Sequence, residues 1–429
     1  MRFFYLAATM LGLASSAAAQ GPAASEPTEP VTAASATTTP ATTAPAPLGI
    51  KSTNILGLPP RLKLLPIPVV FYQEETGLGY GLGLLLSGPL GKDVSDTTTR
   101  SSLIRAQYWT TTEKQSLLQL THTVYTPGEK FYLAGEISAY DLGLFYYGVG
   151  NDNNKANESE QKYKLFIINQ RIQKRVAKDW FAGAQYRLTD ISDIRYDKAA
   201  ENGSPNYFSY DPRVSDRERR GTTISGLGPV VTYDSRDVAL ASYTGSYLDL
   251  GVTFNGKGLG SDFNFTRYQL DARHFRPLFG STKTILALHA LGQFHSGDVP
   301  FRELAGIGAN LGGTLYNSAN VMRGLYEQRF RDRQMAVVEA ELRQYLFWRF
   351  DVAAFGGIGE TAYKFDDFTG DGLKAAGGLG VRFHFIRPVE NGVNRHFQRS
   401  RANRVNLRLD YAVGTNSPAA LYFAIGEAF

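Results

Sequence analysis

The chain offers few side chains whose types and spacing suit catalysis. It has no cysteine, so disulfides, cysteine metal sites and thiol nucleophiles are excluded. His289 and His295 share one predicted strand close to Ser296, but no further polar group is placed to orient a serine nucleophile. Residues 366–372 resemble part of a calcium loop that lacks its closing glutamate. We predict neither an enzyme nor a bound metal or other cofactor.

Nucleotide and nucleic-acid binding are also poorly supported. The glycine run at 77–83 has the spacing of some nucleotide loops, but no Lys-Ser/Thr pair and no helical pattern follow it. Packing within a strand explains this run better. The net charge is only +5 over 429 residues, and no basic stripe accompanies a reading motif. We therefore predict no nucleic-acid partner.

One arginine stands where an ion pair could hold a loop. Arg323 lies between two predicted strands and is followed by Gly324, which permits a close backbone approach or a positive φ. Glu339 and Glu341 lie on the charged face of the next predicted strand. A guanidinium in a confined interior needs a carboxylate, because an unpaired desolvated charge is costly. The alternative is an arginine on a solvated outer loop.

The elements that must position these groups are β-strands. From residue 65 to 429, polar and apolar residues alternate in runs of about ten, separated by turn residues. In 404–411 the even positions are polar and the odd positions apolar, an order that would scatter charges around a helix. The fold class is therefore all-β, a transmembrane antiparallel β-barrel of about 16 strands. We predict strands at 67–73, 77–87, 100–110, 114–126, 131–141, 162–174, 180–192, 222–234, 245–255, 263–276, 282–295, 335–346, 350–363, 374–386, 402–413 and 419–429.

The gaps between these runs are unequal. Long gaps occur at 142–161, 193–221 and 296–334, whereas 127–130 and 414–418 are tight. Membrane barrels have short turns on one side and long loops on the other. A soluble β-sandwich is the alternative, but about 16 strands would then form an unusually large sheet system.

The N-terminal 64 residues differ from the rest of the chain. Residues 1–19 combine a positive charge, an apolar run and an Ala-x-Ala site, the pattern of a secretory signal peptide. A membrane anchor is the alternative, although the apolar run is short for a spanning helix. Most of segment 20–64 consists of Pro, Ala, Thr and Ser, so we predict a disordered periplasmic tail. The barrel is expected to occupy 65–429.

Six segments carry a family resemblance: 146–152, 226–229, 233–237, 300–304, 322–326 and 339–343. Taken together and in order, they resemble the BamA/TamA superfamily of outer-membrane proteins, also called bacterial surface antigen barrels. The resemblance covers about residues 66–429 and implies insertion into the Gram-negative outer membrane by the barrel assembly machinery. It also implies that Arg323 is the tip of a loop inside the barrel and pairs with Glu341, with Glu339 as the alternative partner.

Two features depart from the family pattern. The strand after the loop motif usually carries Phe-x-Asp-x-Gly, but here Gly357 stands at the position of the aspartate, between Phe355 and Gly359. One expected partner of Arg323 is therefore missing. The second departure concerns the POTRA modules that precede the barrel in the assembly and secretion members. Residues 20–64 show no βα pattern, so we expect a member without POTRA domains.

The C-terminal strand bears on function. Leu421, Phe423, Ile425 and Phe429 fall on one face of the last predicted strand, and Glu427 falls there too. The family resemblance implies a role in inserting or translocating other outer-membrane proteins through a weak seam between the first and last strands. Gly426 and Phe429 would border this seam. Outer-membrane lipids and unfolded outer-membrane proteins are the expected partners. The alternative function is a structural or pore-forming barrel.

Overall fold

The computed structural model describes a β-barrel that begins at residue 62. The predicted signal peptide, 1–19, and the predicted tail up to residue 61 lie outside the described residues. No helix within the described part of the chain is long and apolar enough to cross a membrane. The described residues are 62–73, 77–90, 99–196, 199, 203–308, 321–327, 329–384 and 406–429.

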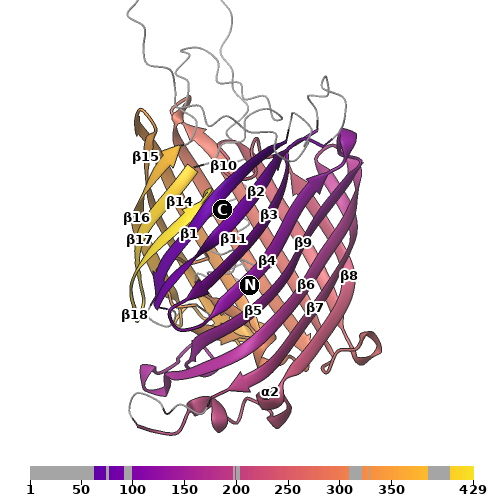
Figure 1. Cartoon of the computed structure of the whole chain (residues 1–429), viewed down its shortest axis with the longest axis vertical. Coiled ribbons are helices and arrows are strands. Elements are labelled where there is room, and N and C mark those ends of the chain that lie inside the picture. Colours follow the sequence, from indigo (N-terminus) through magenta and orange to yellow (C-terminus); the bar gives the residue numbers. More distant parts are fainter. Residues whose placement is uncertain are drawn as a thin grey trace, which may run out of the picture. The chain divides into compact units, whose positions relative to one another are not determined.

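Sixteen antiparallel strands form one sheet, and each pairs with its neighbours along the chain (Figure 1). Each of the sixteen predicted runs corresponds to one of these strands, which confirms the predicted all-β class. The strands are β1 Lys63–Gln73, β2 Gly77–Gly88, β3 Ser102–Thr111, β4 Ser116–Tyr125, β5 Phe131–Tyr146, β6 Ser159–Ala177, β7 Trp180–Arg195, β8 Thr222–Asp234, β9 Gly245–Asn255, β10 Phe265–Leu278, β11 Ser281–Gly297, β14 Gln334–Phe347, β15 Phe350–Ala362, β16 Lys374–His384, β17 Asn406–Gly414 and β18 Ser417–Ile425.

The sheet curls until its two end strands, β1 and β18, lie side by side (Figure 1). Every other neighbouring pair of strands is joined by a backbone ladder, such as β17 to β18 through Leu409 and Phe423. Between β1 and β18 the described residues contain no such ladder. This boundary, which we call the seam, is therefore the weakest join in the wall.

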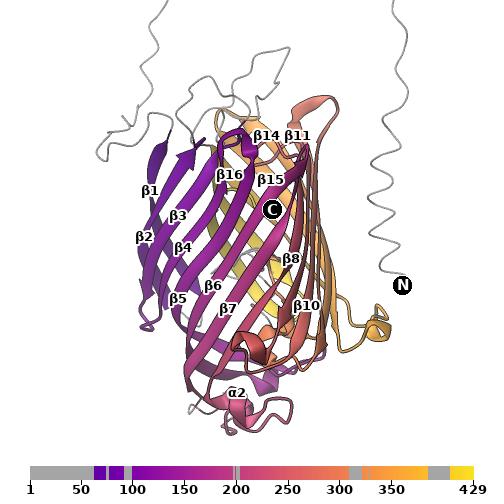
Figure 2. The same cartoon turned by 90° about the vertical axis from the view of Figure 1, so that its right-hand side faces the viewer.

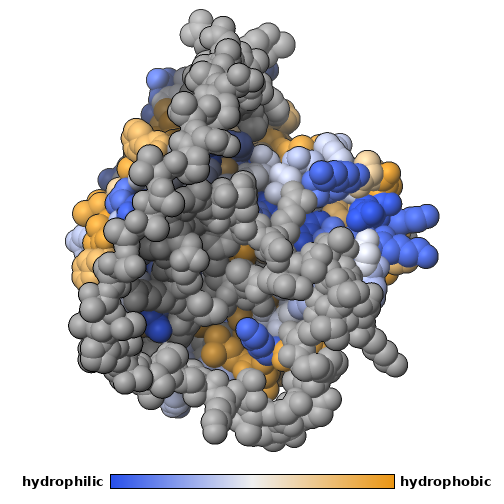
Figure 3. Space-filling model, turned by 90° about the horizontal axis from the view of Figure 1, so that it is seen from above, coloured by the Kyte–Doolittle hydropathy of each residue, from blue (hydrophilic) through white to orange (hydrophobic). Residues whose placement is uncertain are grey.

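Polar side chains face the interior of the barrel and apolar side chains face outward, the reverse of a soluble protein. On β14, Glu339, Glu341 and Arg343 are buried inside the barrel, whereas the intervening Leu342 is 42% exposed on the outside. Apolar side chains also appear on the outer flank of the wall seen end-on (Figure 3). An exposed apolar face around a polar interior suits a lipid-facing barrel, and the soluble β-sandwich alternative is wrong. Further exposed apolar residues on the outside are Leu118, Leu120, Ile137, Ile172, Leu379, Leu409, Tyr411, Leu421 and Phe423.

The two ends of the barrel differ. Three long connections, 147–158, 196–221 and 298–333, lie at one end, which we call the loop end, with helix α2 Asp216–Arg220 among them (Figure 2). Tight turns such as 178–179, 279–280 and 348–349 join the strands at the opposite, short-turn end. Aromatic residues gather there: Trp180 packs against Tyr233 with 5.0 Å between the tilted ring centroids. Such girdles mark the membrane interface of barrels.

Some strand ends differ from the prediction. β5 reaches Tyr146 and β6 begins at Ser159, so the predicted gap 142–161 is shorter than expected, because the two strands continue pairing beyond the apolar band. The glycine run lies within β2, where Gly79 and Gly83 are buried on the inner face and Leu82 is exposed on the outer one.

Candidate functional site: a charged cluster in the barrel lumen

The connection between β11 and β14 folds into the barrel. It contains a small sheet of β12 Ala305–Ile307 and β13 Phe330–Asp332. Its apolar residues Val321 and Leu325 pack against Met335 and Val337, which face inward from β14. Burial of these side chains holds the loop in the lumen, since apolar contact is the main source of packing free energy.

Arg323 lies at the tip of this loop, and its side chain has no exposed surface. Its Nη2 atom is 2.5 Å from Oε2 of Glu341 on β14, and its Nη1 atom pairs with Asp410 on β17. Glu339, the alternative partner, instead accepts a hydrogen bond from the main-chain N–H of Met322 at 2.9 Å. The pairing of Arg323 with Glu341 that the family resemblance implies is thus present.

The pair belongs to a larger set of charges. Arg382 on β16 forms ion pairs with three carboxylates: Nη2 lies 3.3 Å from Glu341, Nε lies 3.0 Å from Glu427, and Nη1 pairs with Asp410. Arg343 places its Nε atom 2.7 Å from Glu341. The set is called here the lumen cluster and consists of Arg323, Glu341, Arg343, Arg382, Arg408, Asp410 and Glu427.

The missing aspartate at position 357 has a steric explanation. A Cβ atom at Gly357 would come within 2.7 Å of Glu339 Cγ and 2.8 Å of Met322 Sδ, so the position has no room for a side chain. Asp410 provides the second carboxylate from β17. Phe355 adds a cation–π contact, with Arg323 Cζ 3.5 Å from the ring centroid.

The loop tip rests on the last two strands. Gly324 has φ +106°, and a Cβ there would come within 2.5 Å of the carbonyl oxygen of Val413 on β17, so this close approach requires glycine. The Gly324 N–H donates to the hydroxyl of Tyr422 on β18 at 3.0 Å, and the Tyr326 N–H donates to Ser417 at 3.2 Å. The tip is therefore bound to one side of the seam.

The C-terminal segment departs from the prediction. β18 ends at Ile425, and Gly426 with φ +82° turns the chain inward. Phe429 does not follow Phe423 on the outer face. It is buried and stacks on His289 at 4.9 Å between ring centroids. The placement of Phe429 on the final strand was wrong because the positive φ at Gly426 ends the alternation.

Glu427 does not lie on the apolar outer face, where the alternation of the last strand placed it. After the turn at Gly426 its carboxylate lies 3.0 Å from Arg382 and accepts a hydrogen bond from Asn406 at 2.5 Å. The C-terminal segment 426–429 therefore enters the lumen cluster from the short-turn end, opposite to the loop that carries Arg323.

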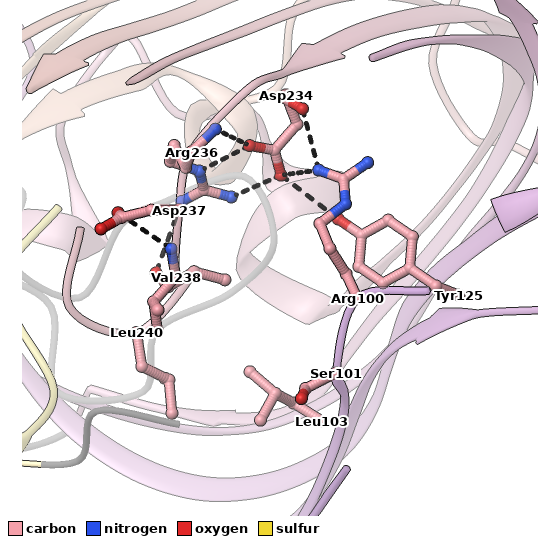
Figure 4. A pocket seen from close by; sticks show the side chains of 10 residues that line it. Arg100, Ser101, Leu103, Tyr125, Asp234, Arg236, Asp237, Val238 and Leu240 are labelled. Carbon is pink, nitrogen blue, oxygen red and sulfur yellow. Dashed lines mark hydrogen bonds and ion pairs between the residues drawn. The ribbon is translucent and has the colours of Figure 1, made fainter. Parts of the chain in front are cut away.

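A second ion-pair group holds the β8–β9 turn inside the short-turn end (Figure 4). Asp234 binds Arg236 through two hydrogen bonds, at 2.9 and 3.0 Å. Arg100 Nη1 lies 3.2 Å from the same carboxylate. The Arg100 guanidinium also donates two hydrogen bonds to the carboxylate of Glu129, at 2.8 and 3.0 Å. With Tyr125 and the turn residues, these side chains line a small cavity of about 30 Å³. The turn is thereby fixed in the lumen.

The β8–β9 turn meets the C-terminal segment across the lumen. The Glu427 N–H donates to the carbonyl oxygen of Leu240 at 2.9 Å. Arg343 donates to the carbonyl oxygen of Ser242 and to the main-chain oxygen of Phe429, both at 3.1 Å. Turn, C-terminal segment and lumen cluster are thus one connected unit.

Several connections at the loop end contact one another. The Gly150 N–H donates to the carbonyl oxygen of Arg331 at 2.7 Å, which joins the β5–β6 connection to the folded-in loop. Tyr146 donates to Asp211 in the β7–β8 connection at 2.7 Å. Burial acts to raise the pKa of Asp211, but hydrogen bonds from Arg213 and Tyr146 outweigh it and hold that pKa below its usual value.

The lumen cluster can hold segments in place, but it has no arrangement for bond chemistry. The lumen cluster contains four arginines and three carboxylates, and Glu339, which lies near Arg323, adds a fourth carboxylate. A buried set of this kind adds little net stability, but it strongly penalises the loss of any one partner. No group of three or more His, Asp or Glu side chains among the described residues is placed to hold a metal ion.

The residues that sequence reasoning missed are Asp410, Arg382 and Glu427. The alternation of charges on their strands indicated an inward direction for Asp410 and Arg382, but it could not indicate which inward residues meet. For Glu427 the signal was the glycine directly before it, a residue type that commonly ends regular structure through a positive φ.

Comparisons with known proteins relate the chain to outer-membrane barrels and to one family. A comparison with curated protein sequences found no match. Among solved structures, the chain is similar to BamA from Haemophilus ducreyi lacking POTRA domains 1–3, at a TM-score of 0.48 and 14% identity over 85% of this chain and 68% of that one. It is also similar to CdiB from Acinetobacter baumannii, at 0.49 and 11% over 86% and 60%. The Omp85 superfamily domain matches residues 101–384, more than half of the chain. The chain belongs to the Omp85 superfamily.

Proposed function

We propose that the protein inserts or translocates other proteins at the outer membrane of a Gram-negative bacterium. The observation that carries this proposal is the seam, where β1 and β18 are neighbours and the described residues contain no ladder between them. An unpaired strand edge can accept an incoming strand through main-chain hydrogen bonds. Membership of the Omp85 superfamily supports the same role.

In this proposal the lumen cluster controls one side of the seam. Gly324 contacts β17 and β18, and Arg323 ties that contact to Glu341, with Glu339 holding the backbone of Met322. Gly426 and Phe429 fix the end of β18 from within. When the cluster loosens, β18 is freed to separate from β1. The short-turn end would face the periplasm, as it does in bacterial barrels.

The proposed partners follow from the location. Outer-membrane lipids would surround the exposed apolar face, the barrel assembly machinery would insert the chain after removal of residues 1–19, and unfolded outer-membrane proteins would be the clients.

The test is depletion of the protein followed by measurement of the abundance of the other outer-membrane barrel proteins. We expect the abundance of at least one of them to fall and to recover when the wild-type gene is restored. Unchanged abundance of all of them would contradict the proposal.

The contents of the lumen argue against an open pore. Three segments occupy it: the folded-in loop with Arg323, the β8–β9 turn with Leu240, and the C-terminal segment with Phe429. In planar bilayers we expect small, flickering currents. A steady, large current would instead favour the pore-forming alternative.

A further inference from the structure

A histidine and a glutamine lie on the lipid-facing side of the barrel wall. His122 on β4, Gly135 on β5 and Gln170 on β6 are register partners, so their side chains share one face of the sheet. That face is the outer one, because Leu120 and Ile137, two residues away on the same strands, are 41% and 43% exposed. Figure 2 shows this part of the wall from outside.

The two polar residues lie within the apolar band, not at its rim. Along β6 the exposed lysines 164 and 174 enclose the outward residues 166, 168, 170 and 172. Ten residues of a strand tilted by about 40° rise by about 26 Å, which matches the apolar band of about 25 Å in outer-membrane barrels. Gln170 is six residues from Lys164 and four from Lys174, close to the middle of the band. Lipid headgroups do not reach this depth.

Both neighbouring rows of the outer face are apolar. The register that joins β4, β5 and β6 places aliphatic side chains on either side of the polar row. The polar row is therefore an isolated interruption of an otherwise apolar surface. The row on the loop-end side is Leu120, Ile137 and Ile168, and the row on the other side is Val124, Leu133 and Ile172.

The polar row has the form of a notch. A Cβ atom at Gly135 would overlap both the His122 ring and the Gln170 amide, so the two side chains converge over the glycine. Gln170 Nε2 donates to the carbonyl oxygen of Glu136 at 3.3 Å. Within the part of the chain that the structure describes, neither the Gln170 amide oxygen nor the His122 ring has a hydrogen-bond partner. Acyl chains offer none, and such groups are costly in a bilayer.

We propose that this notch is the centre of an interface with a second copy of the chain within the membrane. A two-fold axis along the membrane normal in front of Gly135 brings the converging His122 and Gln170 side chains of one copy against those of the other, because both side chains meet over the glycine on that axis. An amide has donors and an acceptor, and a neutral imidazole has one of each. The contact is therefore self-complementary, as an isologous interface requires. This inference does not depend on an assembly role.

The absence of cysteine from the sequence allows a clean cross-linking test in phosphatidylethanolamine/phosphatidylglycerol vesicles. Copies carrying His122→Cys are mixed with copies carrying Gln170→Cys and oxidised. We expect this mixture to form a disulfide dimer. The matched control replaces Gln170→Cys by Leu342→Cys, an outward residue on β14, and should give only random dimer.

Energy transfer between labelled full-length chains provides a second measurement in the same vesicles. The double variant His122→Leu/Gln170→Leu should fold, since leucine suits the lipid face, and should lower the association constant about tenfold. Folding is checked by the gel mobility of the unheated barrel. A wild-type chain that stays monomeric, cross-linking equal to the control, or exclusive association with a different membrane protein would each overturn the second-copy interface.

Discussion

The Arg323 guanidinium joins three strands of the wall to one loop. It contacts Glu341 on β14, Phe355 on β15 and Asp410 on β17. The side chain has no exposed surface, so water cannot replace a lost partner. The residue therefore acts less as a source of overall stability than as a fixed point for the loop, because a buried charge is most costly when its partner is removed.

Substitution Arg323→Ala should free the loop without unfolding the barrel. Glu341 and Asp410 would lose a buried cation, a change that typically costs about 3–5 kcal/mol locally, while the strand ladders stay intact. Limited proteolysis and hydrogen exchange should show faster cleavage and exchange in 321–327. The control Arg195→Ala removes an exposed pair with Asp141, which should cost about 0–1 kcal/mol. Equal protection of the loop in both variants would contradict this role.

Part of this site could be predicted from the sequence. Alternation placed Glu341 inside the barrel, and the family loop motif placed Arg323 beside it. Asp410 could not be assigned, since 410 − 341 = 69 residues separate it from Glu341 along the chain, and only the packing of the strands around the loop tip brings the two to the same guanidinium. The lack of space for a side chain at Gly357 depends on Met322, whose position follows from the loop conformation.

Restoring the family aspartate with Gly357→Asp should weaken the loop, not strengthen it. The new side chain would collide with Met322 and would place a second anion beside Glu339. We expect faster exchange at 321–327 than in the wild type, and partial recovery in the double variant with Met322→Ala. Slower exchange in the single variant would show that Asp410 leaves Arg323 incompletely paired.

At the scale of elements, two segments inside the short-turn end are joined by a hydrogen bond. The N–H of Glu427 in the C-terminal segment donates a hydrogen bond to the carbonyl oxygen of Leu240 in the β8–β9 turn. The alternation of the wall could be predicted from the sequence, but these inward turns could not, since they follow from backbone geometry at single residues such as Gly426.

The isosteric change Asp234→Asn should release the β8–β9 turn. It leaves Arg236 without its carboxylate and removes one of the two carboxylates that Arg100 contacts. Hydrogen exchange should rise in 235–244 and also in 426–429, because the two segments share hydrogen bonds. The control Asp141→Asn changes an exposed pair and should alter neither. If only 235–244 responds, the two segments are not coupled.

A methyl group at Gly426 should disturb the C-terminal segment alone. Alanine at φ +82° is strained by about 1–2 kcal/mol, and its Cβ would come within 3.0 Å of the Leu240 carbonyl oxygen. Exchange should rise at 426–429 while β17 and β18 keep their protection. Gly256→Ala, at an extended φ of −164°, is the control. No difference between the two variants would contradict a role for the positive φ.

At the scale of the whole molecule, the barrel was the most predictable feature. Period-2 alternation identifies strands and their inner faces, and an even count of sixteen allows the sheet to close with both ends on one side. The ends of β5 and β6 were less predictable, because pairing continues outside the apolar band, where no alternation of hydrophobicity marks it. The state of the seam was not visible in the sequence.

In the proposed function, the seam between β1 and β18 acts on other outer-membrane proteins. The most direct measurement is the folding rate of an added, urea-unfolded outer-membrane barrel protein into vesicles that contain the purified chain. A cysteine pair joining the start of β1 to the end of β18 provides the matched control, since the natural chain has no cysteine. We predict faster folding with the wild type, loss of the acceleration when the pair is oxidised, and recovery on reduction. Folding no faster than in vesicles holding an unrelated barrel, or acceleration unaffected by the closed disulfide, would contradict the account.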